Sequence, residues 1–250
     1  MNADACPEGS EQSRPAIRAE MPAITPTHID SLHEVFWLWE QHDILIILAD
    51  SRSVLSNHAE ILDRFERSQQ SRYITQYARC RYAASRTLAK LILAIILQEN
   101  SLEDVILEKE PTGGIRVAGE DSVFLCVSYA HNLLALAFAH SRVGIDIEYI
   151  RPLALRHIPS LVGAICGGDP GEPQDWTTFL QHWTAMEAYV KYSNSALWKM
   201  LQSPQAGKEG YTGSYIIFDS IVLSLVTEEP CPPHRMRCVI PRLIWGDQGE

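Results

Sequence analysis

Short apolar runs and longer segments with helical spacing alternate along the first half of the chain. Val35–Trp39 and Ile44–Leu48 are apolar and rich in β-branched or aromatic residues, which is typical of buried strands. From residue 59 to residue 98 the spacing is helical instead. Its later part places three side chains at four-residue steps, on a face that we expect to stay polar: Tyr82, Arg86 and Lys90.

The second half predicts more strands and one long helix. Strands are expected at Val123–Val127, Leu133–Phe138, Tyr215–Phe218, Val222–Val226 and Arg237–Ile240. The helix is expected at Trp176–Tyr192, with one buried stripe of four side chains: Phe179, Trp183, Met186 and Val190. Strands and helices recur in both halves of the chain, so the expected fold class is α/β or α+β.

Residues 142–150 alternate between apolar and other residues, which predicts a strand with two unlike faces. One face carries Val143, Ile145 and Ile147. The other carries Gly144, Asp146 and Glu148, so the two carboxylates project from the same side of the strand, close together.

Residues 1–32 read as a disordered leader, since four prolines lie among Ser, Glu and Ala without periodicity. The remaining chain is long enough for one large domain or two small lobes. We place an N-terminal lobe at 33–127 and a C-terminal lobe, which carries the candidate site, at 128–250.

Composition narrows the function classes. The chain has 21 basic and 31 acidic side chains and a formal charge of −10, which offers no overall attraction to nucleic acid or anionic membranes. Its six cysteines form no C-x-x-C pair or zinc-type spacing, and no apolar stretch is long enough to span a bilayer. We expect a cytoplasmic protein without nucleic-acid or membrane partners.

Asp146 and Glu148 form the first candidate for chemistry. Two like charges so close call for a cation, and hard oxygen ligands suit Mg²⁺, which keeps other positions for water and phosphate oxygens. The competing interpretation is a solvent-facing acidic pair on an edge strand, which is common on protein surfaces.

Glu187 and Lys191 form the second candidate, one helical turn apart on the predicted helix. The competing interpretation is an ordinary surface ion pair, worth only about 0.3 to 0.5 kcal/mol. Neither pair decides the function by itself.

Together the two segments resemble a known family. Val143-Gly-Ile-Asp-Ile-Glu148 and Trp183-x-x-x-Glu-Ala-x-x-Lys191 are similar, in order and spacing, to the two signatures of Sfp-type 4'-phosphopantetheinyl transferases. Ser128 lies where this superfamily has its S-H-S motif, and Arg86 lies on the helix that carries an arginine for coenzyme A. The resemblance covers roughly residues 35–191.

The resemblance implies a two-lobed pseudodimer, in which each lobe is a small sheet packed with a long helix. The cleft between the lobes would bind coenzyme A and Mg²⁺. The metal ligands would be Asp146, Glu148 and Glu187, and the catalytic residues Glu187 and Lys191. The contacts to coenzyme A would come from Arg86, Ser128 and Tyr129. The implied reaction is that of a holo-[acyl-carrier-protein] synthase type transferase, which moves phosphopantetheine to a serine of an acyl or peptidyl carrier protein in polyketide, nonribosomal peptide or fatty acid biosynthesis. We expect a monomer.

Three positions depart from the family pattern. Met186 stands where the family has a lysine, Tyr129 stands where the S-H-S motif has its histidine, and Gly113-Gly114 stands where a G-K-P segment supplies another lysine. Each departure removes a cation or donor that would contact phosphate. Two alternatives therefore stay open: a degenerate transferase-like protein that binds a carrier or acts on a carrier-bound substrate, and an unrelated Mg²⁺ phosphohydrolase.

Overall fold

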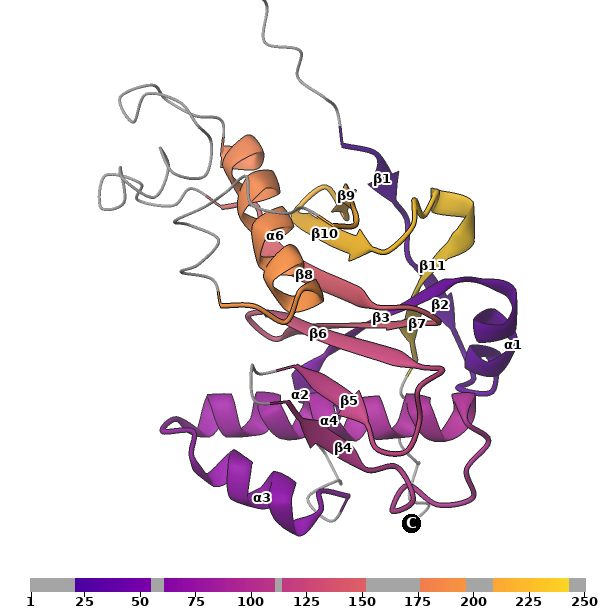
Figure 1. The fold of residues 1–250 in the computed structure, drawn as a ribbon. Coiled ribbons are helices and arrows are strands. Elements are labelled where there is room, and N and C mark those ends of the chain that lie inside the picture. Colours follow the sequence, from indigo (N-terminus) through magenta and orange to yellow (C-terminus); the bar gives the residue numbers. More distant parts are fainter. Residues whose placement is uncertain (1–20, 55–60, 111–113, 152–175, 197–208, 243–250) are drawn as a thin grey trace, which may run out of the picture.

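The computed structural model describes residues 21–54, 61–110, 114–151, 176–196 and 209–242, which form a mixed α+β fold with two sheets (Figure 1). The seven-stranded sheet has the order β2-β11-β3-β7-β6-β5-β4. Its strands are β2 (Thr27–Ile29), β11 (Met236–Pro241), β3 (Ile44–Asp50), β7 (Leu133–Ala139), β6 (Phe124–Ala130), β5 (Ile115–Val117) and β4 (Leu107–Lys109). The four-stranded sheet has the order β1 (Ala23–Ile24), β9 (Tyr211–Ile217), β10 (Ile221–Thr227) and β8 (Val143–Tyr149).

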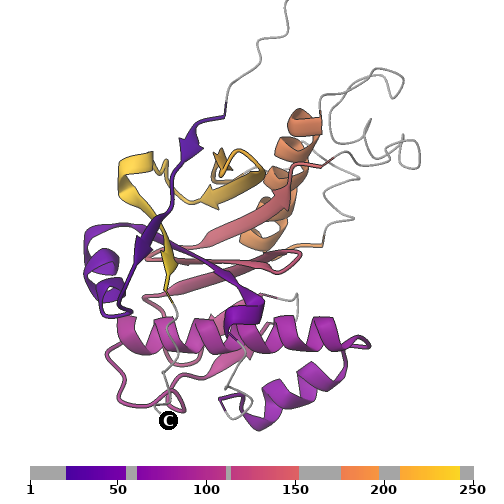
Figure 2. The same cartoon turned by 180° about the vertical axis from the view of Figure 1, so that it is seen from behind.

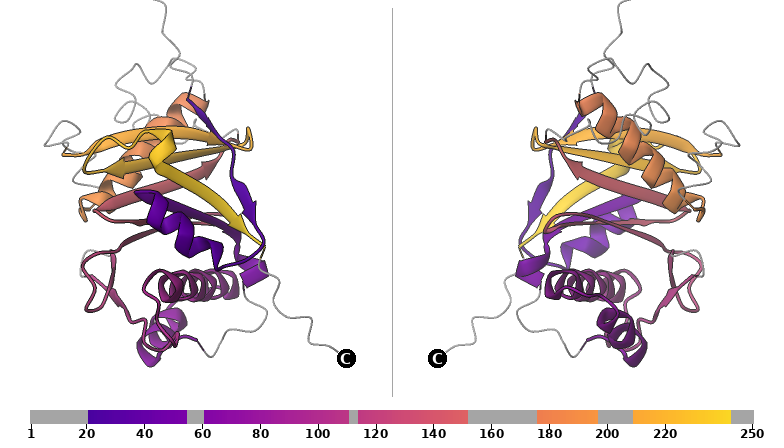
Figure 3. Two further views of the ribbon diagram at one scale, coloured as in Figure 1. Left: turned by 90° about the vertical axis from the view of Figure 1, so that its right-hand side faces the viewer. Right: turned by 90° about the vertical axis from the view of Figure 1, so that its left-hand side faces the viewer.

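Helices cover the outer faces of both sheets, so the molecule has four layers (Figures 2 and 3). Helix α6 (Trp176–Tyr192) packs on the four-stranded sheet through Val222 and Val226 of β10. The two sheets enclose one core, and the other face of the seven-stranded sheet packs on α1 (Glu34–Gln41) and α4 (Gln76–Ile96). The shorter α2 (Ser51–Val54), α3 (Arg64–Ser71) and 3-10 turn η2 (Pro233–Arg235) complete the described elements.

The central strands are apolar on both faces because both faces are covered. In β3, Leu45 and Ile47 contact the helical layer, whereas Ile46 and Leu48 contact the other sheet. Such strands read as continuous apolar runs rather than alternating ones. The predicted strands at Ile44–Leu48, in the 123–138 region and in the C-terminal part are confirmed, with ends that differ by a few residues.

The strand predicted at Val35–Trp39 is wrong, because this segment is helix α1. Val35 and Trp39 are the buried residues of the helix, and their four-residue spacing puts both on the face toward α4 and β3. A five-residue apolar run fits a strand and a buried helical face equally well.

The predicted helical region contains two helices, and the polar face expected on the second is wrong. An Asp63–Glu66 capping box begins α3, and the Thr75 hydroxyl caps α4. Tyr82, Arg86 and Lys90 are all buried, since the sheet covers one side of α4 and α3 packs on another. Lys90 reaches Glu66 of α3 at 2.8 Å, and both side chains are at most 2% exposed.

The disordered leader expected over residues 1–32 is wrong from Met21 onward. β1 pairs in parallel with β9, and β2 pairs in parallel with β11, so this short segment joins the edges of both sheets. Ile29 is only 3% exposed and packs into the core beneath the seven-stranded sheet. Residues 1–20 lie outside the described part of the chain.

A lobe boundary between residues 127 and 128 would fall inside β6, so the two sheets do not divide there. β11, from the C-terminal part of the chain, also pairs with β3 from the N-terminal part. The two-lobed pseudodimer stays a prediction. Among the described helices, none combines the length and apolar character needed to cross a membrane.

Candidate functional site

Asp146 lies at the centre of β8, on the face toward α6, and is 3% exposed. β8 is an edge strand, so the backbone N–H groups on its open side have no neighbouring strand in the same sheet. Two of them donate to side chains of β6 instead: Ile145 N to Cys126 Sγ, and Ile147 N to Ser128 Oγ. The Ser128 hydroxyl donates in turn to Asp146 Oδ1 at 2.7 Å. Ser128 therefore holds the carboxylate in place, a role that differs from the coenzyme A contact implied by the resemblance.

Lys191 comes from the last turn of α6 and reaches across to β8. Its Nζ lies 2.7 Å from Asp146 Oδ1 and donates to the Ile145 carbonyl at 3.0 Å. Burial lowers the pKa of Lys191, but the groups around it, Asp146 foremost and then Cys126 and Glu187, together outweigh burial, and the net pKa lies above the ordinary value. The ammonium is thus held charged beside the acid.

Gly144 allows this approach of helix and strand. A Cβ there would lie 2.7 Å from Tyr192 N and 2.8 Å from Tyr192 Cβ, and closer still to the Ala188 carbonyl oxygen. The glycine that opens the first motif therefore has a packing role, because only a residue without a side chain lets α6 lie so close to β8.

Glu148 and Glu187 complete the group, one from β8 and one from α6. Burial raises the pKa of Glu148, and the charge of Asp146 raises it further. The same two causes, in the same order, raise the pKa of Glu187 to about 7. Repulsion among the three carboxylates adds to the effect of burial, and Lys191 offsets only part of it.

The donor set fits a hard cation in its chemistry. Among the described residues, Asp146 Oδ2 is buried and no donor forms a hydrogen bond with it. In the described residues, no three His, Cys, Asp or Glu side chains are already gathered as a metal ligand set, and Lys191 occupies the contact at Asp146 Oδ1. Mg²⁺ needs few protein ligands, since it keeps waters and phosphate oxygens in its shell.

Arg86 and Tyr129 lie on the other face of β6, against the helical layer. The Tyr129 ring packs on the core beneath the seven-stranded sheet, and its hydroxyl shares a 2.9 Å hydrogen bond with Ser85 Oγ. The Arg86 guanidinium lies over the Tyr82 ring, and its Nη1 is buried without a hydrogen-bond partner in the described part of the chain. The structure thus separates the predicted site residues into an acidic group and a group around Arg86.

A basic pocket of about 410 Å³ surrounds the second group. Three cations line it, Arg72 just after α3, Arg86 of α4 and Lys109 of β4, together with three phenol rings: Tyr73, Tyr82 and Tyr129. Arg72 and Lys109 were not predicted from the sequence. The arginine-rich stretch from Arg64 to Arg86, in a chain of net negative charge, is the signal that could have indicated this local basic site.

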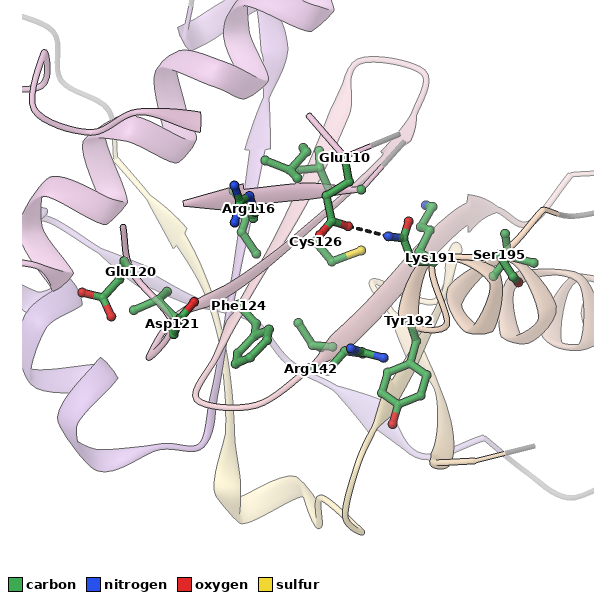
Figure 4. Close-up of a pocket in the computed structure, with 18 residues that line it drawn as sticks. Glu110, Arg116, Glu120, Asp121, Phe124, Cys126, Arg142, Lys191, Tyr192 and Ser195 are labelled. Carbon is green, nitrogen blue, oxygen red and sulfur yellow. Dashed lines mark hydrogen bonds between the residues drawn. The ribbon is translucent and has the colours of Figure 1, made fainter. Parts of the chain in front are cut away.

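A second pocket, of about 460 Å³, adjoins Lys191 (Figure 4). It lies between β5, β6, the start of β8 and the end of α6, with Glu110 and Arg116 on one side and Arg142 and Tyr192 on another. Both pockets share Ile115 and Val127 in their lining. Within the described residues, β5 pairs with β6 only through Ile115 and Leu125, so both pockets meet at an unpaired stretch of the β6 edge.

The positions that depart from the family pattern lie around these groups. Met186 is half-buried on α6, beside Glu187, and Tyr129 lines the basic pocket. Gly114 lies in the second pocket, near the Glu110 carboxylate, which accepts a hydrogen bond from Asn194. Gly113 is outside the described residues.

Comparison with known proteins agrees with the motifs. No protein-family model matches the chain. The 4'-phosphopantetheinyl transferase HetI of Nostoc sp. is 28% identical to it over 185 residues, which cover 70% of this chain and 75% of HetI. The comparison therefore confirms the resemblance of the chain to the phosphopantetheinyl transferase superfamily.

Proposed function

We propose that the protein transfers the 4'-phosphopantetheine group from coenzyme A to a serine of an acyl or peptidyl carrier protein, in a Mg²⁺-dependent reaction. The observation that carries the proposal is the acidic group, in which Asp146 is buried, its Oδ2 has no hydrogen-bond partner among the described residues, and Glu148 and Glu187 have raised pKa values. The relative HetI, named as a 4'-phosphopantetheinyl transferase, supports the same reaction class.

The metal ligands in this proposal are Asp146, Glu148 and Glu187. Bound there, Mg²⁺ would neutralise charge on the pyrophosphate of coenzyme A and so make its phosphorus easier to attack. Ser128 keeps Asp146 in one orientation through its 2.7 Å hydrogen bond. Such supporting contacts hold a ligand set in the productive geometry.

The transfer itself forms a bond from the serine oxygen of the carrier to the phosphorus and breaks the pyrophosphate bond, releasing adenosine 3',5'-bisphosphate. The serine proton passes to a carboxylate of the acidic group, and Glu187 is our candidate. The Lys191 ammonium, which is kept charged by Asp146, would stabilise the negative charge that develops on the phosphate oxygens.

The nucleotide end of coenzyme A would occupy the basic pocket. Arg86 offers a buried Nη1 that no described residue contacts by a hydrogen bond, and Arg72 and Lys109 add charge around the same space. Charge-assisted contacts of this kind are the strong ones in phosphate binding. A coenzyme A molecule that contacts both the basic pocket and the acidic group would cross the unpaired edge of β6, where the two pockets meet.

One observation favours a second candidate, a transferase-like protein that binds a carrier without transferring the group. Met186 brings no charge to the site, and the Tyr129 hydroxyl is already bonded to Ser85. Both positions would contribute phosphate contacts in the family pattern, so the loss of both could leave a carrier-binding protein.

The deciding experiment incubates the protein with Mg²⁺, coenzyme A and a panel of apo carrier proteins and measures the phosphopantetheine increment by intact mass. Asp146→Asn keeps an oxygen for Ser128 and Lys191 but removes the charge, so we expect transfer to fall about a hundredfold or more. Asp50→Asn, at an exposed acid paired with Arg52, is the matched control and should transfer normally. No increment on any carrier would favour the second candidate, and full transfer by Asp146→Asn would exclude the acidic group as the metal site.

A further inference from the structure

The corner between α3 and α4 is strongly basic in a chain whose formal charge is −10. Residues 64–81 contain five arginines and a single acid, Glu66, which is buried and paired with Lys90. None of the described acids forms an ion pair with Arg72, Arg79 or Arg81. These guanidinium groups therefore carry charge that no described acid neutralises.

Large apolar side chains are exposed among these arginines. Ile74 is 94% exposed, and Tyr73 and Tyr77 are 40% and 47% exposed. Single exposed apolar residues are ordinary, but neighbouring ones framed by charges mark contact sites. We call the five residues that form this feature the corner surface: Arg72, Tyr73, Ile74, Tyr77 and Arg81.

The corner surface is held in one arrangement. The Arg81 guanidinium lies over two rings, 5.4 Å from the centre of Tyr77 and 4.7 Å from the centre of Tyr129. Arg79 Nε donates to the Tyr73 carbonyl at 2.8 Å, which fixes the turn between the helices. A surface arranged in advance loses little conformational entropy when a partner binds.

Its position connects it to the candidate site. Arg72 and Tyr73 line the basic pocket, and Tyr129, beneath Arg81, follows Ser128, which is bonded to Asp146. The corner lies at the start of α4, at the end of this helix away from α1 (Figure 1). A macromolecule that binds here would therefore lie beside the basic pocket.

We propose that the corner surface docks the carrier protein, through carboxylates that face the arginines and an apolar side chain that covers Ile74. Charge complementarity selects an acidic protein as the occupant, and the exposed Ile74 and tyrosine rings supply the apolar contact at the centre of the surface. This assignment rests on the proposed function, because that function requires a carrier serine to approach the acidic group.

The test compares Ile74→Glu with Trp37→Glu. Ile74 makes almost no contact within the fold, so the substitution should leave stability unchanged while adding a repulsive charge. Trp37, 66% exposed on α1, is the control at the other end of α4. Calorimetry with acidic apo carrier proteins should show about tenfold weaker binding for Ile74→Glu, because Ile74 would lie at the centre of the interface. Binding by Trp37→Glu should be unchanged. Coenzyme A affinity should be unchanged in both variants, and carrier affinity should fall as salt is raised.

Equal carrier affinity for Ile74→Glu and the unaltered chain, or equal losses in both variants, would overturn the docking assignment. So would tighter binding of single-stranded RNA or of phosphatidylserine vesicles than of any carrier, or no binding of any acidic carrier. Transfer that is normal in Ile74→Glu with normal carrier affinity would refute the docking surface alone. Carrier binding that depends on Ile74, without any mass increment, would refute the transferase reaction alone.

Discussion

Gly144→Ala should separate α6 from β8 and damage the acidic group without altering any charged residue. The new Cβ would lie 2.7 Å from Tyr192 N, whereas real Cβ atoms essentially never approach within 3.0 Å, and the conflict with the Ala188 carbonyl oxygen is larger. These atoms belong to backbone within a helix, so the helix must shift as a whole. Overpacking of this kind costs about 3 kcal/mol at its upper range.

The shift should also reach Lys191, which directly precedes Tyr192 and spans only 2.7 Å to Asp146. We therefore expect Mg²⁺-dependent binding of coenzyme A to weaken together with the loss in stability. Denaturant titration measures the loss in stability, and calorimetry well below the melting temperature measures the binding of coenzyme A. Gly119→Ala is the control, because no atom of the described residues lies within 4 Å of the Cβ that alanine would add. The positive φ of 74° at this position should cost about 1 kcal/mol, with no change in ligand binding. A Gly144→Ala protein as stable as Gly119→Ala, with normal coenzyme A affinity, would refute this account of the motif glycine.

Two further predictions concern stability alone. Lys90→Met should cost about 3 kcal/mol in a denaturant titration, because it leaves Glu66 buried without its ion-pair partner, whereas Arg52→Ala, at an exposed pair, should cost less than about 1 kcal/mol. Adding Glu66→Gln to Lys90→Met should recover part of the loss, and a Lys90→Met protein no less stable than Arg52→Ala would contradict the argument. A chain that begins at His33 lacks β1 and β2 and the burial of Ile29, so its thermal midpoint should fall by about 5 °C or more. An unchanged midpoint would show that these two strands add nothing to stability.

The parts of the fold that the sequence predicted well are those in which a local pattern and the tertiary environment agree. β8 alternates as expected, with Ile145 and Ile147 in the core between the sheets and Asp146 toward α6. On α6 the predicted apolar stripe is only partly buried. Leu180, Thr184 and Ala188 are buried instead, because the close approach at Gly144 favours small side chains and the Thr184 hydroxyl finds a partner in Ser224.

Other features depend on contacts between distant segments. From the sequence, a lysine such as Lys90 is expected on the surface. Its burial depends on Glu66 of α3, which lies 24 positions earlier in the sequence and whose carboxylate is 2.8 Å from the Lys90 ammonium. The pairing of residues 21–29 with β9 and β11 joins the two ends of the chain, which no local pattern reveals. Their three-residue and two-residue strands are also too short to give a period.

The positions of Ser128 and Tyr129 show how much structural detail a strand motif can predict. Neighbouring residues in a strand point to opposite faces, so the two could not both contact one ligand on one side of β6. The structure turns Ser128 toward Asp146 and Tyr129 toward Ser85 and Arg81. Alternation along residues 126–130 could have predicted this division, because Cys126 and Ser128 share a face while Val127 and Tyr129 share the other. One strand thus supports the acid on one face and lines the basic pocket on the other, and the unpaired edge of β6 is the place where a single ligand could contact both.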